Sequence, residues 1–304
     1  MIDQLSRILS PYLIERDRID RWEQEIPIYP ISHPTPALQA NSYYFGHSQW
    51  GKDYFEACHR DPLFIDRWQA ATGCWEGKIV VDIGCGAGNL YAALRDRCGQ
   101  PQQLIGIDVS LGALKMAQRW GYQAILADAQ QLPLVSGFAD MVIANATIHH
   151  CDDMEKMLSE AARLVRPGGL LVTDHDPQRT AWKDNAIARL LWNSRLPLYR
   201  LLKRGGHATA EEQFWSLATE AHHDIGDGVG AELYHRVLEP LGFSVKLYPH
   251  NRTVGAPVLE GNSGRANWNI RLAQRLCGVN PDTPEAAILL MCVATRNATG
   301  IISI

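Results

Sequence analysis

The sequence predicts an α/β protein built on a doubly wound, mostly parallel sheet. Short apolar runs alternate with helix-like segments from about residue 78 to residue 176. This alternation is typical of right-handed β–α–β crossovers, which place helices on both faces of a parallel sheet. The chain has 304 residues, of which 46% are hydrophobic and 20% are charged, as in an ordinary globular protein. We therefore expect one core domain with additions.

The elements of this core follow from the hydrophobic pattern in chain order. Five strands are predicted at 78–84, 103–109, 123–128, 139–147 and 169–176. Helices are predicted at 89–96, 111–121 and 154–166, the last of them amphipathic and ended by Pro167, Gly168 and Gly169. Two later apolar runs, 242–250 and 286–295, are predicted to be strands as well.

Two regions lie outside this core. Residues 1–75 precede the sheet and are expected to form an N-terminal helical cap, so that the ligand-binding domain covers 76–304. Within that domain, about 177–237 has a helical pattern with many aromatic residues, which predicts an inserted lid after the fifth strand. Pro197 is expected to interrupt any single long helix in the lid.

Composition narrows the class of protein. The net charge of -4 gives no global attraction to nucleic acid or to an anionic membrane. Seven cysteines, an odd number without a C-x-x-C pair, argue against a disulfide framework or a zinc site and for a reducing compartment. The N-terminus carries charges every few residues and resembles neither a signal peptide nor a membrane span. The expected location is the cytoplasm.

A glycine-rich turn follows the first strand, with the spacing Gly84-x-Gly86-x-Gly88. A dinucleotide site instead favours G-x-G-x-x-G, where the pyrophosphate lies on a helix N-terminus. Asp82, two residues before the turn, would repel a pyrophosphate but suits a ligand with a cationic end. Asp108 ends the second strand, where an acid can accept both ribose hydroxyls. The combination predicts an amino acid joined to a nucleoside as the ligand.

Five motifs in order resemble the class I S-adenosylmethionine (SAM) methyltransferases, particularly the branch that methylates small molecules such as quinones and natural products of secondary metabolism. They are VVDIGCGAGNL, IGIDVS, LADAQQLPL, FADMVIANATIHH and LVRPGGLLVTD. The one departure is Ala139, where the family often has Phe before the Asp. The resemblance implies a Rossmann-like, seven-stranded sheet with the last strand antiparallel. It also implies SAM as the cofactor and S-adenosyl-L-homocysteine as its product.

The resemblance assigns roles to individual residues. Asp108 would bind the ribose, Asp128 the adenine amino group, and the Ala129 N–H a ring nitrogen. The segment before the sheet would carry Tyr43, Tyr44 or Trp50 over the cofactor, as in similar methylases; packing of these aromatics in the core is the alternative. The full expected set is Asp82, Gly84, Cys85, Gly86, Gly88, Asp108, Val109, Asp128, Ala129, Asn145, Ala146, Tyr43 and Tyr44.

Histidines are the candidates for catalysis. His149 and His150 close the fourth strand at the ligand-binding edge, where a histidine can act as a general base at neutral pH. A scaffold role is the alternative, since the family branch often carries His there. His222 in the lid is a further candidate base. Asp174 and Asp176 end the fifth strand at the same edge, but no spacing requires a metal, and none is predicted.

The leading hypothesis is methyl transfer to an oxygen, nitrogen or carbon atom of a small, aromatic or apolar molecule. The segment 179–204 is both apolar and basic, so it is either a helix resting on a membrane surface or a lid with solvated charges. Methylation of RNA or protein is the second hypothesis, weakened by the acidic net charge. A third is a SAM-binding protein that catalyses no methyl transfer. The residues specify no oligomeric state.

Overall fold

A computed structural model describes residues 8–202 and 209–298 of the chain. Nine strands form one sheet: β1 (Arg21–Glu23), β2 (Ile26–Ile28), β3 (Ile79–Ile83), β4 (Gln103–Asp108), β5 (Gln123–Leu126), β6 (Ala139–Asn145), β7 (Val165–Pro177), β8 (Phe243–His250) and β9 (Leu289–Arg296). Their order across the sheet is β1-β2-β5-β4-β3-β6-β7-β9-β8. The doubly wound fold is therefore confirmed, with two strands more than predicted.

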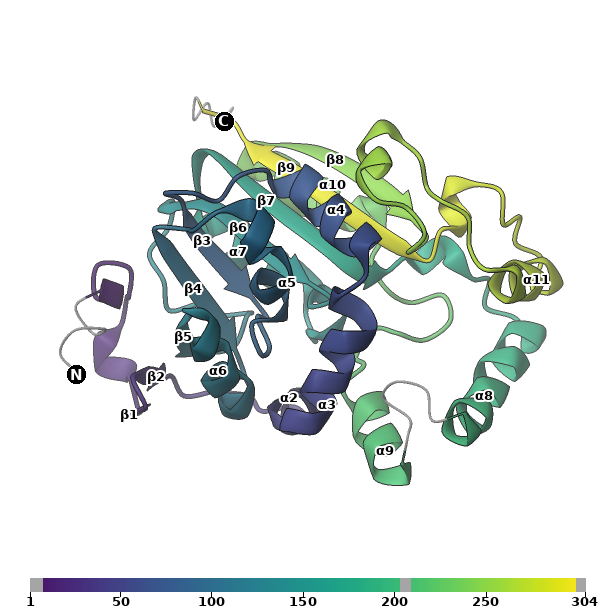
Figure 1. Cartoon of the computed structure of the whole chain (residues 1–304), viewed down its shortest axis with the longest axis horizontal. Helices are drawn as coiled ribbons and strands as arrows, with labels where there is room; N and C mark the ends of the chain where they lie inside the picture. Colours follow the sequence, from purple (N-terminus) through teal and green to yellow (C-terminus); the bar gives the residue numbers. More distant parts are fainter. Residues whose placement is uncertain (1–7, 203–208, 299–304) are drawn as a thin grey trace.

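The central strands β5, β4, β3, β6 and β7 run parallel to one another. Strand β9 runs antiparallel to both β7 and β8, so the predicted antiparallel last strand is present. Parallel strands bring their carboxyl ends to one edge of the sheet. This edge, which faces α2, α3 and α9 in Figure 1, is where the loops after β3, β4, β5, β6 and β7 gather.

The helices are α2 (Pro36–Gly46), α3 (Ser48–Tyr54), α4 (Pro62–Thr72), α5 (Asn89–Cys98), α6 (Leu111–Ala117), α7 (Met154–Leu164), α8 (Ala186–Leu201), α9 (Ala210–Ala218), α10 (Ala231–Leu238) and α11 (Trp268–Leu276). A π-helical segment, η2 (Phe55–His59), links α3 to the turn before α4. Their starts follow local chemistry. Both α2 and α4 begin with a proline behind a capping side chain, Thr35 and Asp61, which accepts a backbone N–H.

Alternating strand residues supply two separate cores, one on each face of the sheet. Val81 faces the core formed with α7 and α10, and its neighbour Val80 faces the core formed with α4, α5 and α6. Figure 1 shows α4, α5 and α6 together on one face. Trp68 and Trp75 are fully buried in the second core, where burial of large apolar side chains contributes most of the stabilisation.

The N-terminal segment is not entirely helical, which corrects the predicted helical cap. Strands β1 and β2 pair with each other and extend the sheet beyond β5, where Ile28 pairs with Leu126. Ile26 and Ile28 are buried against the second core. Burial of these apolar residues outweighs the short length of the strands and the presence of Pro27 at the sheet edge.

The lid consists of α8, α9 and α10 with their connections. Helix α8 passes through Pro197 unbroken, so the expected interruption is wrong. A proline removes one helical hydrogen bond, but side chains bind nearby carbonyls of α8. Ser194 Oγ donates to Leu191 O at 2.9 Å, and Gln213 Nε2 donates to Leu196 O at 3.1 Å. Lys203, Arg204 and His207 lie outside the described residues.

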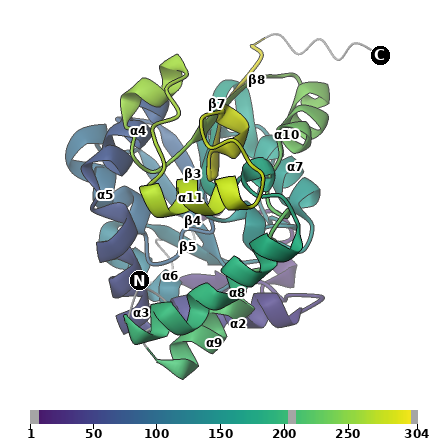
Figure 2. The same ribbon diagram turned by 90° about the vertical axis from the view of Figure 1, so that its right-hand side faces the viewer.

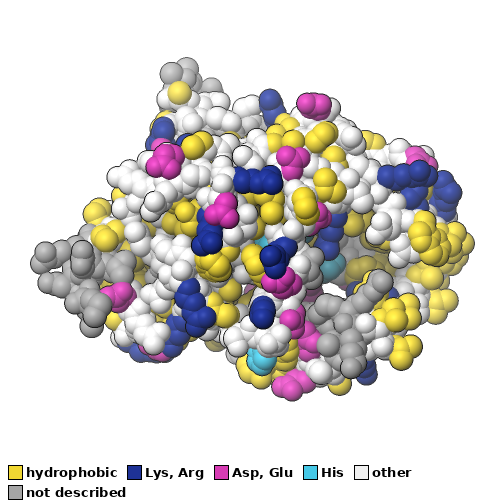
Figure 3. Space-filling view, in the orientation of Figure 1, with side chains coloured by type: hydrophobic (Ala, Val, Ile, Leu, Met, Phe, Trp, Pro, Cys, Tyr) yellow, Lys and Arg dark blue, Asp and Glu magenta, His cyan; other side chains and the backbone are white. Residues whose placement is uncertain are grey.

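A second excursion between β8 and β9, residues 251–288, carries α11, which the sequence reading did not separate as an element. Helix α11 packs against α8, and Figure 2 shows α11, α8 and α9 lying across the same end of the molecule. Their exposed apolar residues are Ile187, Leu190, Leu198, Leu201, Leu202, Phe214, Leu217, Trp268, Leu272 and Leu276. In Figure 3 hydrophobic side chains gather at this end of the surface.

Candidate active site

A pocket opens at the carboxyl edge of the sheet, beside the glycine turn. It encloses about 1030 Å³ with its solvent-open mouth included. Of the predicted cofactor residues, those that line it are Asp82, Gly84, Cys85, Gly86, Asp108, Val109, Asp128, Ala129, Asn145 and Ala146. The loops that follow four neighbouring strands, β3 to β6, thus meet at one cavity, as expected for ligand sites in open α/β sheets.

The glycines of the turn have different tasks. Gly86 has a φ of 53°, and a Cβ there would meet nothing within 4 Å, so the backbone is open to a ligand. Gly88 is not among the residues that line the pocket, and its cofactor contact stays a prediction. A Cβ on Gly88 would lie 2.8 Å from Tyr122, so this glycine serves the packing of α5 against the loop before β5.

Asp108 is held in a fixed orientation at the end of β4. Its carboxylate accepts the Gly86 N–H at 2.9 Å and the Ser110 N–H at 2.8 Å. Burial raises the pKa of Asp108, while these two backbone donors lower it. The same hydrogen bonds that support the negative charge fix the carboxylate at the mouth of the glycine turn.

Asp82 is almost completely buried at the end of β3. The Tyr122 hydroxyl donates to its carboxylate at 2.6 Å. Burial raises the pKa of Asp82 to about 7, against the lowering effect of the Tyr122 hydrogen bond. A cationic ligand group beside Asp82 would favour its charged form.

The pocket is acidic. Asp82, Asp108, Asp128 and Asp152 line it, and neither Lys nor Arg is among the described lining residues. Such a lining repels a pyrophosphate and attracts a ligand that carries positive charge. The electrostatics therefore favour a sulfonium with an ammonium group, as in SAM, over a dinucleotide.

Helix α2 covers the pocket with a face that the sequence reading missed. Leu38, Asn41 and Phe45, spaced three and four residues apart, all line the cavity. Tyr43 and Tyr44 lie on other sides of α2 and are not among the residues that line the pocket. Tyr43 packs on Trp215 with a centroid distance of 4.5 Å, and Tyr44 stacks on Trp50 at 5.2 Å.

The lid is tied to α2 and to the end of β6 through one carbonyl. Thr219 O accepts from Asn41 Nδ2 at 3.1 Å and from His150 Nδ1 at 2.7 Å. Because the partner is a carbonyl, Nδ1 of His150 carries the hydrogen and Nε2 is the acceptor nitrogen. His150 lines the pocket, and burial together with the neighbouring His149 lowers its pKa to about 4.

The other two candidate bases, His149 and His222, are not among the residues that line the pocket. His149 is buried behind His150; burial lowers its pKa, but hydrogen bonds to Asp176 and Glu220 outweigh this and raise it to about 9. His222 bonds instead to Asp227 and to the Asp152 carbonyl. The lid chain directs His222 away because its N–H donates to His149 O at 2.8 Å.

The end of β7 holds two carboxylates in separate clusters. Asp174 accepts from Arg67 Nε at 2.9 Å and contacts His250 Nε2 at 2.7 Å, and all three side chains are buried. Asp176 contacts His149 instead. Between them His175 has a φ of 67°, at the place where the β7–β9 register shifts. A left-handed backbone conformation is strained at a residue other than glycine, and such strain concentrates near functional sites.

The sheet order, the glycine turn and the acidic pocket define the fold of the class I SAM-dependent methyltransferases. Residues 81–173 match the family model described as a methyltransferase domain. The chain therefore contains a class I methyltransferase domain, and SAM is the cofactor of this class.

Known proteins resemble this domain in sequence or the chain in its fold. A malonyl-[acyl-carrier protein] O-methyltransferase of Methylovorus sp. (strain MP688) is 38% identical over 106 residues, 31% of this chain and 36% of that protein. The tRNA (carboxymethyluridine(34)-5-O)-methyltransferase ALKBH8 of Mus musculus is 38% identical over 96 residues, 31% of this chain and 14% of that protein. The matches thus span about a third or less of these relatives.

Among solved structures, the plantazolicin methyltransferase BamL, in complex with a triazolic desmethylPZN analog and SAH, has a TM-score of 0.51 and 18% identity. The similarity covers 86% of this chain and 96% of that one. At this identity the likeness concerns the fold alone.

Proposed function

We propose that this protein transfers the methyl group of SAM to a small, aromatic or apolar molecule. The observation that carries the proposal is the acidic pocket, in which the glycine turn opens beside the fixed carboxylate of Asp108. Asp82 would face the ammonium group, Asp108 the ribose, and Asp128 with Ala129 the adenine. Methyl transfer from a sulfonium needs mainly alignment of the acceptor and exclusion of water.

The closed lid supports a small acceptor. Thr219 binds to α2 and to His150, and Trp215 packs on Tyr43, so the lid is held against the helix and the histidine that line the pocket. A folded RNA or protein would have to displace these contacts. The pocket lining also supplies apolar surface through Leu38 and Phe45.

His150 is the residue we assign to orient the acceptor. Its Nδ1–H is held by Thr219 O, which leaves Nε2 to accept a hydrogen bond from an acceptor hydroxyl or amine. Both curated relatives are O-methyltransferases by name, which favours an oxygen acceptor. His149 and His222 remain outside this role because neither lines the pocket.

The direct test is to incubate the purified protein with methyl-deuterated SAM and an extract separated into small-molecule, lipid, RNA and protein fractions. Label in a small molecule or lipid, found by mass spectrometry, supports the proposal and identifies the acceptor. Label found only in RNA or protein would instead favour methylation of a macromolecule. Bound but unconsumed cofactor in every fraction would favour a SAM-binding protein that transfers no methyl group.

The cofactor site has its own test. Asp108→Ala removes a charged acceptor for two hydroxyl groups, each bond contributing about 1.5–3 kcal/mol, so we expect SAM affinity to fall by at least about 100-fold by calorimetry. Asp96→Ala is the matched control, because Asp96 is an exposed acid on α5. An equal loss of SAM affinity in both variants, or no loss in either, would contradict the proposed cofactor position.

A further inference from the structure

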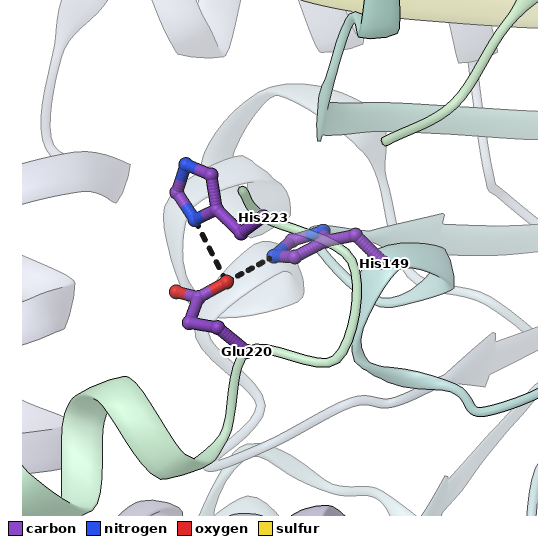
Figure 4. A group of neighbouring side chains, drawn as sticks. All are labelled: His149, Glu220 and His223. Carbon is purple, nitrogen blue, oxygen red and sulfur yellow. Dashed lines mark hydrogen bonds and ion pairs between the residues drawn. The ribbon is translucent and has the colours of Figure 1, made fainter. Parts of the chain in front are cut away.

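A cluster of metal-ligating side chains lies where the lid meets the core. His149 comes from η4 (Ile148–His150), and Glu220 and His223 come from the loop between α9 and α10. Glu220 Oε2 lies 3.3 Å from His149 Nε2 and 2.7 Å from His223 Nδ1, as Figure 4 shows. One donor atom from each residue lies within 4.8 Å of the other two.

A buried carboxylate orients the first of these ligands. Asp176 Oδ1 lies 2.8 Å from His149 Nδ1 and also accepts the His149 backbone N–H at 3.1 Å. Nδ1 therefore carries a hydrogen, and Nε2 is the nitrogen turned to Glu220. Metal-binding histidines in proteins are typically fixed in this way, with the second ring nitrogen donating to a carboxylate.

We propose that His149 Nε2, the Glu220 carboxylate and His223 Nδ1 bind a divalent metal ion of the zinc type. Two imidazoles and one carboxylate suit zinc and its neighbours among the transition metals, whereas magnesium and calcium prefer oxygen ligands alone. The proposal does not depend on methyl transfer and replaces the expectation, from sequence spacing, that no metal is bound.

The distances fit this ion with a small adjustment. Ligands about 2.0–2.1 Å from a tetrahedral zinc ion lie about 3.4 Å from one another. The separation of His149 Nε2 from Glu220 Oε2, 3.3 Å, already matches this value. The 2.7 Å separation of Glu220 and His223 has to widen, and both side chains are partly exposed, so they have room to move.

Such an ion would join the lid to the core beside the pocket. His149 stacks next to His150 with a centroid distance of 4.1 Å, and Glu220 follows Thr219, whose carbonyl holds His150. Three protein ligands leave a fourth position for water. The ion would therefore fix both the lid loop and the orientation of His150.

The test is a cobalt(II) titration of the full chain after treatment with a chelator, followed by the visible absorption of the bound ion and by competition with zinc. We expect one saturable equivalent in the wild-type protein. Glu220→Gln and His223→Gln should each weaken cobalt binding at least tenfold. His235→Gln is the matched control, because His235 pairs with Glu239 at 2.8 Å on the exposed face of α10 without a third ligand; it should bind cobalt as the wild type does.

Failure of the proposal is separable from misfolding and from failure of the proposed function. Circular dichroism and SAM calorimetry of the same variants show whether fold and cofactor site are intact. Absence of a saturable equivalent in the wild type overturns the metal site. Retention of full cobalt affinity in both Glu220→Gln and His223→Gln also overturns it, whatever the outcome of the methyl-transfer assay.

Discussion

At the scale of single residues, the pocket depends on carboxylates whose surroundings differ. Asp108 accepts two backbone N–H groups, while Asp82 has one hydroxyl donor and is buried among apolar residues. Burial raises the pKa of both acids, but Asp108 has more hydrogen-bond donors that support its charge. In the proposed function, the cofactor's charged end would face Asp82 and its neutral hydroxyls would face Asp108.

We expect SAM affinity to depend on pH through Asp82. Burial raises the pKa of this acid to about 7, so below that pH it is protonated in the free protein. An ammonium group beside it favours the carboxylate, so binding releases a proton. Affinity should therefore rise with pH up to about 7, by at most about tenfold per pH unit, and level off above it.

Calorimetry between pH 5.5 and 8, in buffers of different ionisation enthalpy, measures both the affinity and the released proton. Tyr122→Phe removes a hydrogen bond that lowers the pKa of Asp82, so the levelling point should move to higher pH. An affinity that is flat across this range would exclude Asp82 as the ammonium partner.

The buried ion pair of Arg67 and Asp174 should dominate the stability of the β7 end. Arg67→Met leaves the carboxylate without its main partner in a site from which water is excluded, and we expect a loss of about 3–5 kcal/mol in the free energy of unfolding. Urea denaturation measures it. Arg60→Met, at an exposed pair with Glu56, should change stability by less than about 1 kcal/mol.

At the scale of elements, α8 continues through a proline, although proline usually interrupts a helix. Pro197 lies inside the helix, which continues from Ala186 to Leu201 on both sides of it. Its cost is therefore local weakening rather than a break in the helix.

Pro197→Ala should restore one helical N–H and strengthen this part of α8. We expect slower amide hydrogen exchange over residues 193–201, with up to about 3 kcal/mol gained in local opening free energy. Mass spectrometry of exchanged peptides measures the effect, with Leu198→Ala as a control that leaves the proline in place. Unchanged exchange would mean that the proline does not limit the helix.

How far the sequence predicted these elements depended on where their stabilising contacts lie. The core strands were recognisable because residues such as Val80, Val81 and Ile105 form uninterrupted apolar runs. Strands β1 and β2 have three residues each, too few for a periodic signal. The contact of His149 with Glu220 joins segments distant in sequence, so no local spacing could predict it. The Leu38–Asn41–Phe45 face of α2 was not predicted either, although its spacing of three and four residues is that of one helix face.

At the scale of the whole molecule, the end formed by α8, α9 and α11 carries an exposed apolar surface. Monomeric proteins in water rarely expose large apolar patches. Leu190, Leu201 and Trp268 are 69%, 78% and 78% exposed on α8 and α11. Among the described residues no helix combines the length and the apolar composition needed to cross a membrane. Peripheral membrane contact through 179–204 stays a prediction, to which the exposed apolar residues of α8 and α11 give a test.

We expect the protein to sediment with vesicles that contain anionic lipid. The triple variant Leu190→Ser, Leu201→Ser and Trp268→Ser should lose most of this binding, because the buried apolar area supplies much of the affinity. Leu241 is exposed but lies outside α8, α9 and α11, so the control variant Leu241→Ser should bind as the wild type does. Equal sedimentation of all three proteins would favour a lid with solvated charges.

The position of β9 has a consequence for how the protein folds. This strand lies between β7 and β8 and pairs Leu290 with Asp176, so the hydrogen-bonding edge of β7 stays open until the whole lid and α11 have been synthesised. Contacts so distant in sequence form slowly, and an open strand edge can pair with another chain meanwhile. Yield during biosynthesis should therefore depend on how well this edge is protected before residue 289 emerges.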